Sequence, residues 1–235
     1  MQASLLAKLQ HEIASLEQAR QPVGESISTG CAALDRLLPQ HGLRRGTLVE
    51  WLAADGCGAV TLALRTAQEA CREGGVLVVS DRHRQVYPPA LCAYGLELSQ
   101  VVFVHPRNRR DLLWALNQSL RSRAVAAVLC WPEALDDRAF RRLQLSAEQG
   151  ESLGLLMRPP SVRGHPTWSE LQFVVEALPT IGQRAKAPRR LRVEVARCRN
   201  GSSGASVELE IDDETGSIQE SRLVPVAPQL AAATS

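Results

Sequence analysis

The residues whose spacing is closest to a known chemistry lie in a glycine-containing stretch at residues 53–60, here called the degenerate loop. A phosphate-binding loop needs glycine-rich backbone around the phosphates, a lysine for the terminal phosphates and a Ser or Thr hydroxyl for magnesium. In the register set by Gly58, Ala59 stands at the lysine position and Val60 at the hydroxyl position, and Thr61 comes one residue late. The positions that define the loop are Ala53, Asp55, Gly56, Gly58, Ala59 and Val60, with Ala53 in place of the first glycine. The pattern predicts the shape of a phosphate loop without its reactive groups.

Two segments before the degenerate loop suggest which fold contains it. Residues 27–35 read I-S-T-G-C-A-A-L-D, and residues 46–50 read G-T-L-V-E. In order and spacing, these segments and the loop resemble the RecA family, which has an S-T-G-x-x-x-L-D segment, a G-x-x-V-E strand and then a phosphate loop. The resemblance implies a RecA-like core.

The other nucleotide-site groups of the RecA family are also missing at the matching positions. The strand that should end in a metal-binding aspartate ends in Cys130-Trp131, and Arg82, beside Asp81, takes the place of the catalytic glutamate. No lysine lies between positions 9 and 185. We therefore predict a pseudo-ATPase with no catalytic residues, no metal and no cofactor. The alternative is weak nucleotide binding by the amides at the helix N-terminus, which attract anions.

Short apolar strands alternate with helices around this loop. Strands are predicted at 47–53, 75–80, 101–104, 125–130 and 153–157, and helices at 59–72, 89–94, 109–121 and 136–148. This alternation indicates a parallel sheet that is buried on both faces. Segments 171–178, 191–199 and 206–211 alternate apolar and polar residues, which predicts antiparallel strands at the edge or end of the sheet and a hairpin turn at 200–204. The predicted class is α/β: a RecA-like core with a central, mostly parallel sheet flanked by helices, an N-terminal helix and a C-terminal antiparallel hairpin.

These elements divide the chain into four segments. Residues 1–24 are predicted to form an amphipathic helix and a linker, with Leu6, Leu9, Ile13 and Leu16 on one face. Residues 25–180 form the RecA-like core with its degenerate loop, and residues 181–224 a basic and acidic β-hairpin that completes the sheet. Residues 225–235, rich in Ala, Pro, Ser and Thr, are predicted to be a disordered tail.

The composition favours a cytoplasmic protein. Of the 235 residues, 45% are hydrophobic and 22% charged, which is typical of globular proteins. No apolar run approaches the roughly 20 residues that span a bilayer, and the first residues do not form a secretory signal, so no membrane contact is expected. The six cysteines form no Cys-x-x-Cys pair, which argues against a zinc ribbon.

A more specific resemblance lies further along the chain. It rests on residues 109–116 (R-R-D-L-L-W-A-L), 127–132 (A-V-L-C-W-P), 141–148 (R-R-L-Q-L-S-A-E) and 154–159 (G-L-L-M-R-P). Over roughly residues 27–212 the chain is similar to the ImuA family, RecA-related proteins that are often labelled SulA-like. The Trp-Ala-Leu and Arg-Arg-Leu-Gln-Leu segments are specific to that family because RecA itself lacks them.

The resemblance implies a role in the SOS response to DNA damage. ImuA-type proteins belong to an SOS-induced mutagenesis cassette, in which they act with an ImuB-type inactive Y-family polymerase relative and, indirectly, with an error-prone DnaE-type polymerase. We expect a non-catalytic accessory protein of translesion synthesis that binds the ImuB-type partner, with single-stranded DNA as a second candidate. The alternatives are a SulA-like cell-division inhibitor and a RecA-like DNA-binding protein with residual nucleotide binding.

Basic residues in two regions are candidates for contacts with DNA or a partner. The first region is the loop 158–169, with Arg158 and Arg163, at a place where RecA-like cores bind DNA. The second is the segment 184–199, which contains a single acid, Glu194, and the basic residues Arg184, Lys186, Arg189, Arg190, Arg192, Arg197 and Arg199. These side chains can attract phosphates, or they can pair across the hairpin with the acids at 208–220.

Further predictions concern the end of the sheet and the tryptophans. His105, Arg107, Arg109 and Arg110 follow a strand, at the carboxyl edge where open α/β folds bind ligands. Trp51 and Trp114 lie in apolar patterns and are predicted to be in the core. Trp131 is predicted to plug the vacant nucleotide site.

Overall fold

Nine strands form a single sheet in the part of the chain that the computed structural model describes, which is residues 26–179, 188–212 and 215–221. The strands are β1 (Leu48–Ala53), β2 (Val76–Ser80), β3 (Val101–Val104), β4 (Val125–Cys130), β5 (Leu153–Arg158), β6 (Leu171–Leu178), β7 (Arg189–Cys198), β8 (Ser206–Ile211) and β9 (Ile218–Glu220). Their order across the sheet is β3-β2-β4-β5-β1-β6-β7-β8-β9. Neighbours from β3 to β6 run parallel and neighbours from β6 to β9 run antiparallel. The predicted α/β class with a mostly parallel central sheet is confirmed.

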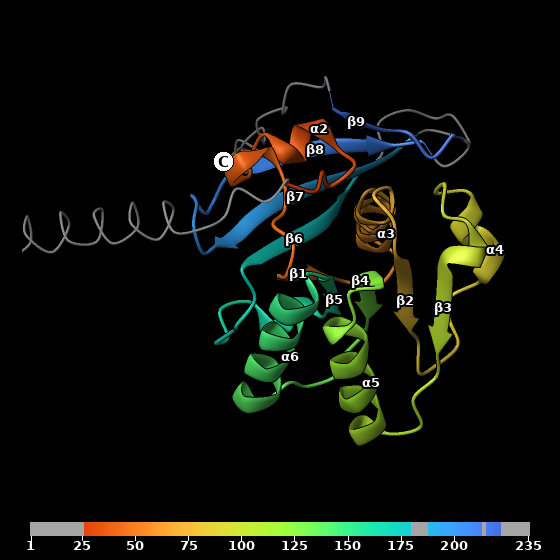
Figure 1. Cartoon of the computed structure of the whole chain (residues 1–235). Helices are drawn as coiled ribbons and strands as arrows, with labels where there is room; N and C mark the ends of the chain where they lie inside the picture. Colours follow the sequence, from red (N-terminus) through yellow and green to blue (C-terminus); the bar gives the residue numbers. More distant parts are fainter. Residues whose placement is uncertain (1–25, 180–187, 213–214, 222–235) are drawn as a thin grey trace, which may run out of the picture.

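Helices cover both faces of this sheet, as Figure 1 shows. They are α2 (Ala32–Asp35), α3 (Ala59–Cys71), α4 (Pro88–Cys92), α5 (Arg109–Arg121) and α6 (Asp137–Gly150), with single 3₁₀ turns at Pro39–His41, Leu98–Gln100 and Pro160–Val162. Helices α5 and α6 lie side by side on one face, and α3 lies on the other. Each face has its own hydrophobic core, one around α3 and one beneath α5 and α6.

Burial and capping explain why the central elements form where they do. Strands β4 and β5 are buried at every position, as expected for parallel strands with helices on both sides. Helix α5 begins after Asn108, whose side chain accepts a hydrogen bond from the Asp111 backbone N–H at 2.9 Å. Helix α6 begins after Asp136, whose carboxylate accepts from the Ala139 backbone N–H at 2.8 Å. That bond, together with Arg109, holds the pKa of Asp136 below its ordinary value.

The predicted position of the strand at 171–178 is wrong. Strand β6 lies inside the sheet, because it pairs with β1 in parallel on one side and with β7 in antiparallel on the other. Its first five residues are all buried, and exposed positions occur only from Glu176 onward. Exposure is therefore confined to the C-terminal end of β6, and the alternation of apolar and polar residues did not indicate an edge position in the sheet.

The antiparallel strands curve back toward α3. Apolar residues of β7 and β8 belong to the same hydrophobic core as α3, among them Leu191, Leu209 and Ile211. In Figure 1 these strands and α2 lie on the α3 side of the sheet. The start of α3 is therefore enclosed by strands that come more than a hundred positions later in the sequence.

Several predictions fall on residues outside the described part. The amphipathic helix at 1–24 and the tail at 225–235 are among them, as are Arg184 and Lys186. Within the described residues, no helix is both long and apolar enough to cross a membrane.

Candidate functional site

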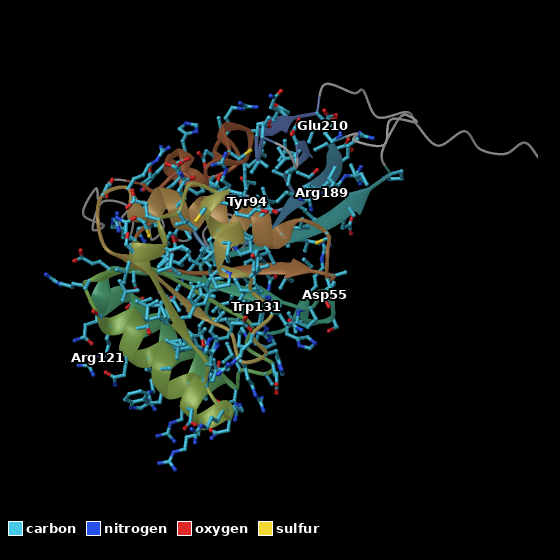
Figure 2. All side chains as sticks on the ribbon, turned by 90° about the vertical axis from the view of Figure 1, so that its right-hand side faces the viewer. Asp55, Tyr94, Arg121, Trp131, Arg189 and Glu210 are labelled. Atoms are coloured by element: carbon cyan, nitrogen blue, oxygen red, sulfur yellow. The ribbon has the colours of Figure 1, made fainter. Side chains whose placement is uncertain are left out.

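The degenerate loop joins the end of β1 to the start of α3, at the carboxyl edge of the parallel strands. Ala53 is the last residue of β1, and Asp55 and Gly56 are exposed beyond it (Figure 2). Gly58 precedes α3 with φ of +94°, and Gly56 has φ of +78°. Positive φ favours glycine, so both glycines are explained by the turn itself, with or without a phosphate.

The side chains at the start of α3 are apolar or already hydrogen-bonded. Ala59 is buried, and Val60 presents only methyl groups to solvent. The Thr61 hydroxyl is buried and lies 3.3 Å from the Tyr94 hydroxyl, which comes from the segment after α4 (Figure 2). The late hydroxyl is therefore engaged in a hydrogen bond with Tyr94.

The outer side of Gly58 lies against the antiparallel strands. A Cβ added to Gly58 would be 2.9 Å from Leu191 Cδ2 and 3.6 Å from Ile211 Cδ1. It would also lie 3.7 Å from Nη1 of Arg189, the first residue of β7. A guanidinium thus stands beside the loop that lacks its lysine. The sequence predicts Arg189 as a contact residue for DNA or a partner, and its position beside Gly58 follows only from the return of β7 toward α3.

The positions of the metal-binding and catalytic acids hold other chemistry. Cys130 ends β4 and is fully buried, and burial raises the pKa of its thiol to about 12. The buried Asp81 carboxylate accepts backbone N–H bonds from His83 at 3.1 Å and Val86 at 2.7 Å, so it fixes the turn after β2. Arg82 makes an exposed ion pair with Glu133 at 2.8 Å. No cluster of three or more His, Cys, Asp or Glu that could hold a metal occurs among the described residues.

The tryptophans lie in different environments. Trp51 is fully buried, as predicted. Trp131 is half-buried and packs against the hydrophobic core that contains Cys57 and Ala59, and its role as a plug stays a prediction. The prediction for Trp114 is wrong, because this side chain is 64% exposed on α5. Buried leucines of α5 lie two positions before and after it, on the opposite side of the helix.

Arg158, a candidate for contact with DNA or a partner, lies inside the fold and not on the surface of the loop. Arg158 ends β5, and its side chain is only 8% exposed; its guanidinium lies 3.2 Å from the Glu50 carboxylate, which is 2% exposed. Glu50 also accepts hydrogen bonds from Thr167, Ser169 and Gln172, at 2.7, 2.8 and 3.0 Å. This buried cluster, here called the Glu50 cluster, fixes the loop after β5 to the centre of the sheet. Arg163 remains half exposed and pairs with Glu194 at 2.6 Å.

The basic segment before the hairpin turn divides into paired and unpaired arginines. Arg190 lies 3.0 Å from Glu208 and 3.8 Å from Glu210, and Arg192 lies 2.9 Å from Glu208. Internal pairing across the hairpin is therefore confirmed for these two. Arg197 and Arg199 are exposed and make no ion pair with the described residues.

The second basic cluster is partly used within the fold. A ring nitrogen of His105 lies 2.7 Å from the Asp81 carbonyl oxygen, and Arg109 bonds to Asp136 at 2.9 Å. Arg107 and Arg110 are exposed. The structure therefore brings His105 to the turn after β2, while Arg109 and Arg110 belong to α5.

Comparison with known proteins agrees with this architecture. The family model of the RecA N-terminal domain matches residues 9–135. Protein ImuA of Caulobacter vibrioides (strain NA1000 / CB15N) is 29% identical over 198 residues, which covers 76% of this chain and 80% of that protein. Protein RecA of Rubrobacter xylanophilus is 34% identical over 145 residues, which covers 60% of this chain and 40% of that RecA.

A solved structure supports the fold alone. The crystal structure of the RadB recombinase superposes with a TM-score of 0.65 and covers 83% of this chain and 99% of the RadB chain. The two sequences are 19% identical over that superposition.

Proposed function

Since the chain belongs to the RecA N-terminal domain family and is a relative of protein ImuA, we propose that it is a non-catalytic accessory protein of damage-induced mutagenesis. In this role it binds an ImuB-type inactive polymerase relative and acts through it with an error-prone DnaE-type polymerase. The polymerases supply the chemistry of synthesis past a lesion. This chain supplies a RecA-shaped surface.

The observation that carries the proposal is the state of the degenerate loop inside a RecA-like fold. A magnesium nucleotide would meet the methyl groups of Ala59 and Val60 where an ammonium and a hydroxyl are needed. β4 ends in Cys130, which is buried in the core beneath α5 and α6, and the next residue is Trp131, which packs against the core around α3, so the end of this strand offers the metal no carboxylate ligand. A RecA-like protein without these groups has no hydrolysis to drive a conformational cycle, which favours a constitutive binding role.

Co-elution with the partner tests the proposal directly. The full chain is mixed with the purified ImuB-type protein of the same organism and run on a sizing column at two salt concentrations, with and without single-stranded DNA. We expect a stable complex that forms without DNA and persists at the higher salt. ATP hydrolysis is measured in the same samples, and we expect none above the protein-free control. Separate elution, or DNA-stimulated phosphate release, would overturn the proposal.

Direct DNA binding is a separable part of this function. Arg197 and Arg199 are the exposed arginines of β7 and its following turn that make no ion pair among the described residues, whereas Arg190 and Arg192 share Glu208. If the chain binds single-stranded DNA through this strand, the double variant R197A/R199A makes the negative slope of log K against log salt shallower by about 1.4, at about 0.7 per phosphate contact. The matched variant R190A/R192A should leave that slope nearly unchanged.

Residual nucleotide binding is the second candidate that a specific observation favours. The Arg189 guanidinium lies beside Gly58, and the first amides of α3 point toward the loop. A titration with a fluorescent ATP analogue measures this binding, and R189A should weaken it if the site exists. Binding that persists in R189A would show that the helix amides act alone.

A further inference from the structure

The outer surfaces of α5 and α6 form a continuous face with no role in the core. The two helices pack closely: the Ser146 hydroxyl donates to Asn117 Oδ1 at 2.7 Å, and a Cβ on Gly150 would lie 2.1 Å from the Leu120 carbonyl oxygen. This contact makes one two-helix surface on the side of the sheet opposite α3 (Figure 1). Here it is called the α5–α6 face.

Helical spacing places an exposed apolar side chain among arginines on both helices. On α5, Arg110, Trp114 and Arg121 are spaced by four and seven residues, so they share one stripe, and all are exposed. On α6, Arg138, Arg142 and Leu145 follow the same rule and are also exposed. Figure 2 shows Arg121 projecting outward at the end of α5.

The charges of this face are unbalanced in a specific way. Its three carboxylates accept hydrogen bonds from within the chain: Asp111 from Asn108 at 2.9 Å, Glu148 from Gln144 at 2.9 Å, and Asp137 from the Trp168 indole. Two of its six arginines also have partners, because Arg109 bonds to Asp136 and Arg141 lies over the Trp168 ring. The other four make no ion pair with any described residue: Arg110, Arg121, Arg138 and Arg142. On α5, Trp114 therefore lies in one stripe between two arginines that make no ion pair with any described residue.

We propose that the α5–α6 face binds an acidic segment of the partner polypeptide, with Trp114 packing against an apolar side chain of that segment. This inference rests on the proposed function, because the partner is the ImuB-type protein. Tryptophan and arginine are the residue types most enriched among side chains that dominate protein interfaces. Burial of the exposed tryptophan ring in a complex removes its apolar surface from water and so stabilises the complex. The guanidiniums of the same face bind carboxylates through paired N–H groups.

The same residue types bind single-stranded nucleic acid, but the charge of this face favours a polypeptide. Six arginines against three carboxylates give the two helices a net charge of +3, counted over 109–121 and 137–150. On α5 Asp111 lies between Arg110 and Arg121, and on α6 Asp137 and Glu148 stand before and after the three arginines, so a phosphate backbone tracking either helix would pass a carboxylate. An acidic peptide segment can place its few charges between them.

Affinity measurements on three chains test the inference. The probe is the purified ImuB-type protein of the same organism, titrated against the wild-type chain, W114A and the charge-reversal variant R110E/R142E. We expect each variant to raise Kd at least tenfold, the loss typical of truncating a dominant interface residue. The control is Y87A, which removes an aromatic side chain that is 69% exposed beside α4, and it should change Kd less than threefold. All variants should unfold within about 0.5 kcal/mol of wild type, because the side chains are on the surface.

Each outcome separates the inference from the function on which it rests. If the wild-type chain does not bind the ImuB-type protein, both are wrong. If the wild-type chain binds and W114A binds equally well, only the inference is wrong. It is also wrong if W114A weakens binding to a labelled oligothymidylate or changes self-association on a sizing column, while Kd for the partner stays the same. Loss of partner affinity in both face variants, with Y87A unaffected, supports it.

Discussion

Replacing Arg158 by methionine tests whether this arginine holds the fold together or contacts DNA. In the wild-type chain its guanidinium lies 3.2 Å from a Glu50 carboxylate that is 2% exposed. Methionine keeps the aliphatic length of the side chain but leaves a buried carboxylate without its cation. Breaking a buried pair in this way costs about 3–5 kcal/mol. Since Thr167, Ser169 and Gln172 still donate hydrogen bonds to Glu50, we expect a loss near the lower figure.

Urea denaturation followed by circular dichroism measures this loss as a change in the free energy of unfolding. A loss of about 3 kcal/mol also lowers Tm by about 6–12 °C, at about 2–4 °C per kcal/mol for a chain of this size. The double variant E50Q/R158M replaces the ion pair by neutral groups and should recover most of the stability. The ion pair is also incompletely satisfied in the wild-type chain, because the buried Arg158 Nε has no hydrogen-bond partner among the described groups. A stable R158M that binds DNA more weakly would refute the reasoning and restore Arg158 as a contact residue.

Three other predictions follow from contacts described above. G58A should lose about 1–3 kcal/mol of stability in urea, because the added Cβ lies 2.9 Å from Leu191 Cδ2 at a φ of +94°. G56A is the control: its Cβ would have nothing within 4 Å, so it should lose only the cost of its positive φ. Equal losses in the two variants would contradict this prediction. Because the pKa of Cys130 is raised to about 12 in the folded chain, the unfolded chain binds fewer protons than the folded chain above pH 9. The free energy of unfolding should therefore fall between about pH 9 and 12, and it should fall less steeply in C130V. E208A removes the shared partner of Arg190 and Arg192 and should lower the free energy of unfolding by about 1 kcal/mol. The control is E220A, which breaks the exposed pair with Arg36, and an equal or larger loss in E220A would argue against the pairing of Glu208.

The elements that the sequence predicted most accurately are those with a clear local pattern of apolar residues. The bounds of β3, α5, β4, β6 and β8 were predicted to the residue: β4 is continuously apolar between two helical layers, α5 has a clear leucine stripe, and β8 alternates apolar and polar residues. The short elements α2 and β9 were not predicted. Four and three residues are too few to show a period.

The candidate site was predictable in what it lacks and not in what surrounds it. The missing lysine and hydroxyl were read directly from the register of Gly58. The position of Arg189 beside Gly58 depends on the return of β7 over α3, and the partner of Arg158 lies 108 positions earlier in the chain. Trp114 was misassigned because its neighbours in sequence are leucines, while its direction follows from the helix. Long-range topology, which no local pattern encodes, decided the cases of Arg189 and Arg158, whereas the exposure of Trp114 follows from the periodicity of α5 itself.

The place of β1 in the sheet has a consequence for synthesis of the chain. Both of its neighbours, β5 and β6, come about 100 residues or more later, as the pairing of Leu48 with Gly154 and of Val49 with Leu171 shows. At about 5–20 residues per second, the ribosome needs roughly 5–25 s to supply them. During that time a strand that is apolar at every position except Glu50 has both edges open, which is the condition under which nascent chains aggregate or recruit chaperones. We therefore expect the nascent chain to remain a chaperone substrate until residue 175 has left the exit tunnel, and to gain its central sheet late and in one step.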